Sequence, residues 1–118
     1  MVRTHKDLDV WKKGIEFVSE IYRVTSSFPK EELYGLTSQI RRAAVSIPSN
    51  IAEGAARNHK KEFKQFLYIS LSSCSEIETQ IIIARNLGYI KLSQNDPLLE
   101  KLDIISKMLQ GLIKSIDK

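Results

Sequence analysis

Apolar residues recur every three or four positions in four long stretches of this chain, and this spacing limits the possible fold more than any other feature. Such a period places the residues on one side of an α-helix, whereas strict alternation, the pattern of a half-buried strand, is almost absent. The four stretches lie at about residues 5–27, 33–55, 59–87 and 97–116. Four helices of about 20 residues with short connections predict an all-α, antiparallel up-down-up-down four-helix bundle. We expect residues 1–118 to form this bundle as one domain.

Proline and glycine residues predict where these helices begin and end. Pro29 should end the first helix, and Gly88 is suited to the position just after the third, because glycine tolerates a left-handed backbone. Asn58 is a candidate N-cap for the third helix, and Asp96-Pro97 predicts the start of the fourth. Pro48 should kink or break the second helix. The apolar pattern continues beyond it, so we expect a kink near Pro48.

The composition is that of an ordinary cytoplasmic protein. Hydrophobic residues make up 42% and charged residues 27% of the 118 residues, as in soluble globular domains. No apolar run approaches the roughly 20 residues that cross a bilayer, and no apolar stretch typical of a secretory signal follows the first basic residues. A single cysteine excludes an internal disulfide and fits a reducing compartment. We expect a cytoplasmic location.

The predicted topology concentrates positive charge at one end of the bundle, which we call the basic end. The start of the first helix, the turn between the second and third helices, and the C-terminus should all meet there. These segments hold ten of the 18 basic residues and five of the 14 acidic ones, a net charge of +5 against +4 for the whole chain. The basic residues are Arg3, Lys6, Lys12, Lys13, Arg57, Lys60, Lys61, Lys64, Lys114 and Lys118, and the acidic ones are Asp7, Asp9, Glu53, Glu62 and Asp117.

A concentrated positive surface attracts phosphate backbones through counterion release, without regard to sequence. The other interpretation of these lysines is an ordinary solvated helix end, because their spacing matches no recognition motif. The candidate nucleic-acid-binding residues are Lys12, Lys13, Arg57, Lys60, Lys61 and Lys64.

Paired charges on the second and third helices predict structural ion pairs. Arg41 and Arg42 are adjacent on a helix, so one should face inward and the other outward. Glu76 and Glu78 diverge in the same way, which argues against a pair of carboxylates for acid–base catalysis. We expect one arginine to pair with one of these glutamates, and Glu53 to serve another basic partner.

The sequence offers no recognisable catalytic or cofactor site. Cys74 lies among serines, and no base stands at a patterned spacing from it, so we expect a buried small hydrophobe and not a reactive thiol. His5 and His59 form no ligand-spaced cluster with Cys74, so no metal site is expected. The isolated glycines make no phosphate-cradling loop. We therefore predict no cofactor and no enzymatic activity.

The third predicted helix also indicates self-association. Residues 81–84 are apolar on every side, whereas a helix in a monomeric bundle buries only one stripe, so Ile82 or Ile83 should face water unless a partner covers it. Scattered exposed isoleucines are the alternative. The candidate interface residues are Tyr68, Leu71, Ile82, Ile83 and Tyr89.

Three segments resemble a known family. They read FPKEELYGLTSQIRRAAVSIPSNIAEGAAR, FKQFLYISLSSCSEIETQ and ARNLGYI, and the similarity begins at DLDVWKKG and reaches the last helix. They are similar to the bacterial 23S rRNA intervening-sequence proteins, also called S23 ribosomal proteins. Residues that match the pattern are Arg41, Arg42, Asn50, Glu53, Gly54 and Arg57.

The resemblance implies a four-helix bundle that assembles as a homopentamer. A similar bundle, the accessory variability protein of diversity-generating retroelements, is a basic pentamer that contacts nucleic acid and a reverse transcriptase. By that likeness, the leading interpretation is a non-catalytic accessory or scaffold protein that associates with nucleic acid, RNA in particular, without sequence specificity. The alternative is a protein–protein adaptor whose basic end meets an acidic protein partner.

Overall fold

Four long α-helices make up nearly the whole chain, as the apolar spacing predicts. The structure is a computed structural model that describes residues 4–117. The α-helices are α1 (Asp9–Thr25), α2 (Leu36–Ala56), α3 (Lys60–Asn86) and α4 (Leu92–Ile116), and two short 3₁₀ helices are η1 (His5–Asp7) and η2 (Lys30–Glu32). No strand occurs among residues 4–117. The all-α class and the four-helix bundle are thus confirmed.

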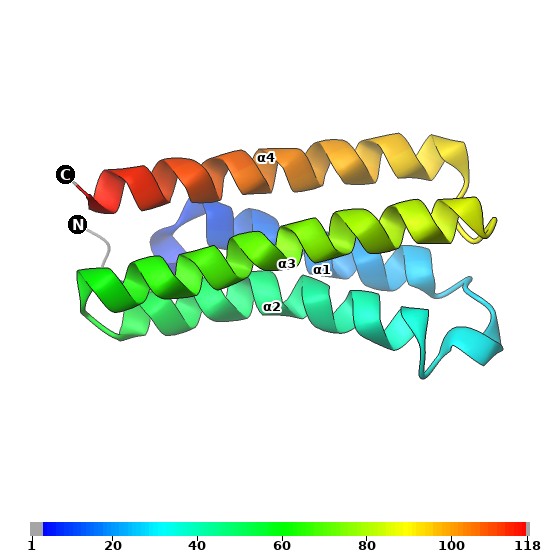
Figure 1. Ribbon diagram of the computed structural model, residues 1–118, viewed down its shortest axis with the longest axis horizontal. Coiled ribbons are helices and arrows are strands. Elements are labelled where there is room, and N and C mark those ends of the chain that lie inside the picture. The colour runs from blue at the N-terminus through cyan, green and yellow to red at the C-terminus, as the bar shows by residue number, and fades with distance from the viewer. Residues whose placement is uncertain (1–3, 118) are drawn as a thin grey trace.

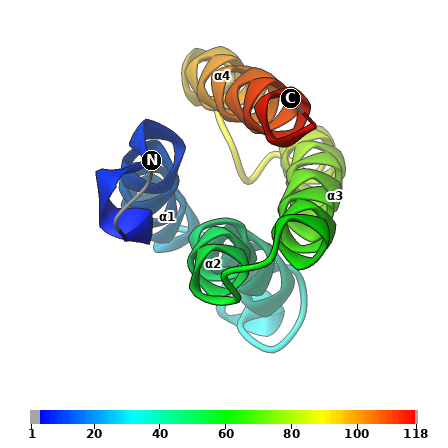
Figure 2. The same cartoon turned by 90° about the vertical axis from the view of Figure 1, so that its left-hand side faces the viewer.

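The helices follow one another around the bundle in chain order. Figure 1 shows α1 and α3 running in one direction and α2 and α4 in the other. Viewed from one end, α1 and α3 lie on opposite sides, with α2 and α4 between them (Figure 2). The start of α1, the α2–α3 turn and the end of α4 share the left-hand end of Figure 1. This arrangement places the predicted basic segments at one end of the molecule.

All four helices contribute to a single apolar core. It is rich in isoleucine, and its largest fully buried side chains, less than 2% exposed, include Ile21, Ile40, Ile47, Ile77, Ile105 and Leu109. α2 and α3 pack most closely, and short polar side chains lie between them. Ser70 donates a hydrogen bond to the Ile47 carbonyl at 2.9 Å, and Ser73 donates to the Ser46 hydroxyl at 2.9 Å.

Helix α2 continues through Pro48 without a break. The proline lies in the interior of the 21-residue helix and is buried. The expectation that the chain does not break there is confirmed, whereas the kink itself stays a prediction. Pro48 lacks the N–H that would pair with the Ala44 carbonyl, so burial of the apolar ring has to offset one lost helical bond.

Two predicted helix starts are wrong. α4 begins at Leu92, and Pro97 lies inside it. The Gln94 side chain accepts a hydrogen bond from the Lys91 N–H at 3.1 Å, which caps the first turn. Pro97 removes only the bond to the carbonyl of Ser93, a residue exposed to solvent, so a proline is tolerated there.

The N-cap of α3 is also one residue later than predicted. Asn58 adopts a left-handed backbone, with φ of 53°, and forms the turn itself. His59 is the N-cap instead, and its Nδ1 accepts a hydrogen bond from the N–H of Glu62 at 3.5 Å.

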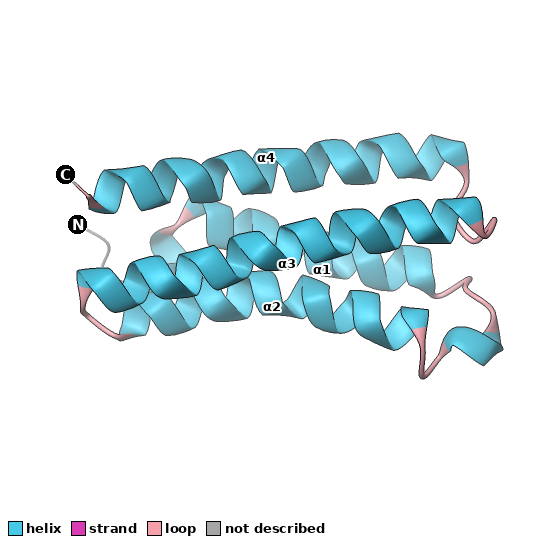
Figure 3. Ribbon diagram, viewed as in Figure 1, coloured by secondary structure: helices cyan, strands magenta, loops and turns pink. Residues whose placement is uncertain are grey.

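The first two predicted helices also start differently in the structure: the helix predicted at 5–27 is divided into η1 and α1, and the helix predicted at 33–55 begins at Leu36. Leu8 is extended between η1 and α1, because Thr4 and Asp7 form a capping box that closes η1 as a separate turn. Gly35 separates η2 from α2 in the same way, and Glu32 accepts a hydrogen bond from the Leu36 N–H at 3.1 Å. Figure 3 shows these connections as short loops.

The end of α3 is as predicted. Gly88 has a φ of 80°, and its N–H donates to the Arg85 carbonyl at 2.9 Å. The N–H of Tyr89 donates to the Ala84 carbonyl at 2.9 Å, which completes a Schellman motif. No helix in the part of the chain that the structure describes is long and apolar enough to cross a membrane.

Candidate nucleic-acid interface

The basic end of the bundle retains its positive charge in the structure. Eight of its ten predicted basic residues lie within residues 4–117, against five acidic ones, a net charge of +3; all eight except the partly buried Lys64 are exposed. Arg3 and Lys118 lie outside the described residues. The start of α1, the α2–α3 turn and the end of α4 face the viewer together in Figure 2. The end is therefore an accessible positive surface.

A concave feature of the basic end lies between the start of α3 and the end of α4. We call it the lysine hollow. It has a volume of about 520 Å³, and it is lined by Lys60, Lys61, Lys64, Gln65, Tyr68, Ile116 and Asp117. The lysines lie in the first two turns of α3, where the positive end of the helix dipole adds to their charge. Three cations, one carboxylate, one aromatic ring and one amide thus face a common space.

An ion pair fixes one side of the lysine hollow. The Lys64 Nζ donates a hydrogen bond to the Asp117 Oδ1 at 2.6 Å, which joins α3 to the residue after α4. This bond raises the pKa of Lys64 above its ordinary value, so the ammonium stays charged at physiological pH. Lys64 therefore serves both the structure and the charge of the hollow.

Arg57 follows α2, three residues before the first lysine of the hollow, and it is not among the residues that line the hollow. Its guanidinium stands 5.2 Å from the centre of the Phe66 ring, and it pairs with Glu53 at 3.6 Å. Both charged side chains remain about half exposed or more, so the pair itself adds little stability. The expected basic partner of Glu53 is thus Arg57, one helical turn away.

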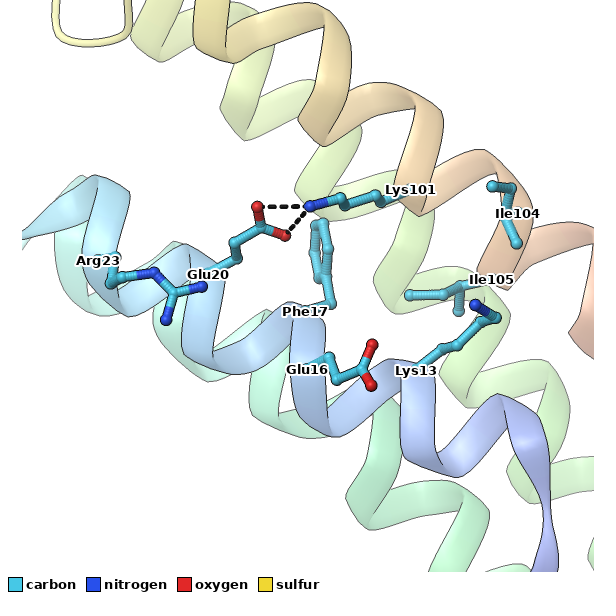
Figure 4. A pocket seen from close by; sticks show the side chains of 8 residues that line it. All are labelled: Lys13, Glu16, Phe17, Glu20, Arg23, Lys101, Ile104 and Ile105. Carbon is cyan, nitrogen blue, oxygen red and sulfur yellow. Dashed lines mark hydrogen bonds and ion pairs between the residues drawn. The ribbon is translucent and has the colours of Figure 1, made fainter.

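Lys12 and Lys13 lie on α1, across the bundle from α3 (Figure 2). Lys13 borders a different hollow of about 330 Å³ between α1 and α4. Figure 4 shows Glu20 and Lys101 pointing toward each other across it, with Nζ to Oε1 at 2.6 Å. The six candidate binding residues therefore share an end of the molecule but divide into two groups. One group lies at the α2–α3 turn and the start of α3, and the other on α1.

The predicted pairing of Arg41 or Arg42 with helix α3 is wrong for Arg41. Arg41 instead joins α2 to α1: its Nε donates to the Thr25 hydroxyl at 2.8 Å, and its guanidinium lies 4.5 Å from the centre of the Tyr22 ring. Helices α1 and α3 both flank α2, so periodicity shows that one arginine turns inward but not toward which neighbour. The predicted difference in burial between the two arginines is confirmed, since Arg41 is half-buried and Arg42 is exposed.

Glu76 and Glu78 make no ion pair with either arginine among residues 4–117. Arg42 and Glu76 do border the same shallow hollow between α2 and α3. Glu76 accepts a hydrogen bond from the Gln80 amide at 3.2 Å, within its own helix, and Glu78 is exposed. The predicted cross-helix ion pair is replaced by a local contact, because an exposed carboxylate loses little by staying in water.

Cys74 is buried, as expected of a structural cysteine. Burial raises the pKa of its thiol, and a weaker opposing contribution comes from the Ser106 hydroxyl. The thiol is therefore protonated at neutral pH and is a poor nucleophile. No cluster of three or more metal-ligating side chains occurs among the described residues.

The candidate interface residues of α3 differ in exposure. Tyr68, Ile82 and Ile83 are exposed by 52%, 37% and 43%, whereas Leu71 is half-buried against the core. The prediction that an isoleucine of the 81–84 segment faces water is thus confirmed for both Ile82 and Ile83.

Tyr89, the fifth candidate, is used within its own chain. Its hydroxyl donates a hydrogen bond to Glu32 at 3.0 Å, which also raises the pKa of Tyr89, and its ring lies 5.4 Å from that of Phe28. The structure thus leaves it less surface for a partner than the sequence suggests.

Sequence reasoning missed the position of Tyr68 among the lysines. The signal is present: Lys60, Lys64 and Tyr68 are four residues apart, a spacing that aligns them on one face of α3. The contribution of Ile116 and Asp117 from α4 could not be found in this way, because it depends on how the two helices are aligned.

Comparison with known proteins agrees with this architecture. The chain matches the family model described as 23S rRNA-intervening sequence protein over residues 6–111. It is also similar to a solved structure from Bacteroides thetaiotaomicron, described as a protein with unknown function from the S23 ribosomal protein family. The two chains are 26% identical, the match covers 89% of this chain and 95% of the other, and the TM-score is 0.82. No curated protein matches the chain.

Proposed function

The chain belongs to the 23S rRNA-intervening sequence protein family, and from this premise we propose that it is a non-catalytic accessory protein that binds RNA at its basic end. The lysine hollow is the observation that carries this proposal. It gathers Lys60, Lys61 and Lys64 around one concave surface, and Arg57 stands at the adjacent turn. An exposed group of cations beside a hollow suits a phosphate backbone.

Counterion release is the physical basis of the proposed binding. Each lysine or arginine that neutralises a phosphate frees condensed cations, so affinity depends strongly on salt and weakly on base sequence. The charges of the hollow come from adjacent turns of one helix, so binding requires no ordering of the backbone, and the remaining entropy cost is that of the lysine side chains. We expect sequence-tolerant binding of RNA and no recognition of a defined motif.

The non-catalytic part of the proposal is supported by the chemistry of the interior. The only cysteine of the chain is buried, and the buried serines on α3 hydrogen-bond to α2 and not to a base. A buried, protonated thiol also fits the cytoplasm, where we propose that the protein acts in a bacterial cell.

Self-association belongs to the same proposal. The exposed Ile82 and Ile83 provide an apolar surface on α3, and the family resemblance suggests five subunits. Like-oriented subunits would repeat the basic end around one rim. A polyanion that contacts several subunits at once would bind far more tightly than it binds one.

Binding of a short fluorescent RNA to wild-type protein and to two variants tests the proposal. In one variant, Arg57, Lys60, Lys61 and Lys64 are all replaced by glutamine. In the control, glutamine replaces four exposed basic residues away from the hollow: Arg23, Lys30, Arg85 and Lys107. Both variants lose four charges, so equal losses of affinity would implicate net charge alone and contradict the proposal.

The alternative function, a protein–protein adaptor, predicts a different preferred ligand. An acidic polypeptide such as polyglutamate, at equal charge concentration, should compete poorly with RNA if phosphate is the ligand. Preferential binding of the polypeptide would favour the adaptor instead.

A further inference from the structure

The lysine hollow contains groups that phosphate binding does not need. Tyr68 is 52% exposed, and it lines the hollow together with Ile116 of α4 and the amide of Gln65. Lysines alone suffice to hold a phosphate, so an aromatic ring left half in water beside them requires another explanation. A flat apolar group with polar edges matches this lining, and a nucleobase is such a group.

The arrangement along α3 also suits a nucleotide strand. Lys60, Lys64 and Tyr68 follow one another at four-residue intervals, which is about 6 Å of helix rise per step. Two ammonium groups and a ring therefore form a row on one face of the helix. Lys61 stands beside the first of them, and the ion pair with Asp117 holds Lys64 in place.

We infer that the lysine hollow binds an unpaired nucleotide of a single strand, with the base on the Tyr68 ring and the flanking phosphates at Lys60, Lys61 and Lys64. This inference rests on the proposed function and narrows it from RNA in general to unpaired RNA. In a duplex the faces of each base are covered by its stacked neighbours, so only edges, sugars and phosphates reach a protein. Tyr68 can stack only on a base that has left the stack.

The hollow has the volume that such a site requires, and its lining can accept different bases. Its volume of about 520 Å³ falls within the range of small-ligand pockets, roughly 300–1,000 Å³. Every base has a face that can stack, and the Gln65 amide can both donate and accept at a base edge. Any unpaired base is therefore accepted.

The inference reassigns Tyr68 from a subunit contact to a ligand contact. Ile82 lies 14 residues further along α3, about 21 Å of helix rise away. The two exposed residues thus have no need to share a partner.

The test compares single-stranded and duplex RNA of one sequence. Fluorescence anisotropy gives the affinity of each for wild-type protein, for Tyr68→Leu, which keeps an apolar side chain, and for Tyr68→Phe, which keeps the ring. We expect Tyr68→Leu to weaken single-strand binding about tenfold or more and to leave duplex binding unchanged. Tyr68→Phe should bind both as the wild type does. The substitution Tyr68→Leu should lower the affinity for single-stranded DNA by the same factor, because stacking does not involve the 2′-hydroxyl.

The outcomes separate this inference from the proposed function. If Tyr68→Leu binds the single strand normally, or weakens single-strand and duplex binding equally, the inference is wrong and the proposed function stands. A loss confined to RNA, or an altered mass of Tyr68→Leu in light scattering, would also contradict stacking as the cause. If wild-type protein binds neither RNA, the proposed function itself is wrong.

Discussion

At the scale of single residues, Arg41 is a polar side chain that ties two helices together through uncharged partners. Its Nε–H donates to Thr25, whose hydroxyl in turn donates to the Ile21 carbonyl at 2.7 Å. Its guanidinium also lies over the Tyr22 ring. One side chain of α2 thereby contacts the last turns of α1, and it has no acidic partner among residues 4–117.

Replacing Arg41 by alanine should therefore destabilise the bundle more than replacing Arg42. Hydrogen bonds of charged groups contribute about 1.5–3 kcal/mol, so we expect a loss of that size for Arg41→Ala. Arg42 is exposed, and Arg42→Ala should change the free energy of unfolding by less than about 0.5 kcal/mol. Denaturant unfolding of the two variants measures both values. Equal effects would contradict the proposed role of Arg41.

The sequence could predict that the two arginines differ, but it could not identify the partner of the inward one. Helical spacing fixes the direction of a side chain relative to its own helix axis. The identity of the group it meets depends on the rotation of each neighbouring helix. Thr25 and Tyr22 carry no charge, so no charge pattern pointed to them.

At the scale of the elements, α2 and α3 approach each other closely at Gly54. A Cβ atom at this position would stand 2.8 Å from the Cβ of Phe66 and 2.9 Å from the Cδ1 of Phe63. The Phe66 Cβ cannot move without its backbone, so the glycine sets the distance between the two helices beside the basic end.

Gly54→Ala should therefore cost about 1–3 kcal/mol of stability, as overpacked cores do. Gly111 is the matched control: it lies inside α4, and a Cβ there meets nothing within 4 Å. Gly111→Ala should raise stability by up to about 1 kcal/mol through helix propensity alone. Thermal melting compares the two variants. A stabilising Gly54→Ala would show that α2 and α3 can separate without loss.

The existence and order of the helices were predictable, whereas several of their ends were not. Apolar periodicity is a property of many residues together, so it survives local irregularities such as Pro48. A helix start depends on one or two hydrogen bonds. The Gln94 side chain, and not Asp96-Pro97, decides where α4 begins. Gly88 was predictable because the position after a helix often has a left-handed backbone, which glycine adopts without strain.

The same distinction explains how much of the candidate site could be predicted. The lysines of the α2–α3 turn follow from topology, since alternate helix ends must meet. Their division from Lys12 and Lys13 follows only once α1 and α3 are placed on opposite sides of the bundle. The hollow also requires the end of α4 as one of its walls. No pattern in the sequence shows which residues of α4 lie beside the start of α3.

At the scale of the whole molecule, the exposed isoleucines of α3 predict self-association. Light scattering at tens of micromolar protein should give about five times the 13.5 kDa mass of one chain. Replacing Ile82 and Ile83 by glutamate should lower this mass, because a charge cannot be buried unpaired in an apolar interface. Glutamate at Ile15 and Ile104, which are slightly more exposed, is the control and should leave the mass unchanged.

A monomer mass for the wild type would contradict the predicted self-association. A stable dimer would preserve the apolar interface and rule out five subunits.

The central claim is that the lysine hollow and Arg57 bind phosphates, and the salt dependence of RNA affinity tests it most directly. Each neutralised phosphate of a single strand contributes about −0.7 to the slope of log K against log salt. Replacing Arg57, Lys60, Lys61 and Lys64 by glutamine should therefore make this slope shallower by up to about 3 for each subunit that contacts the RNA. The slope of the control variant with substitutions at Arg23, Lys30, Arg85 and Lys107 should stay that of the wild type. An unchanged slope in the first variant would contradict the claim.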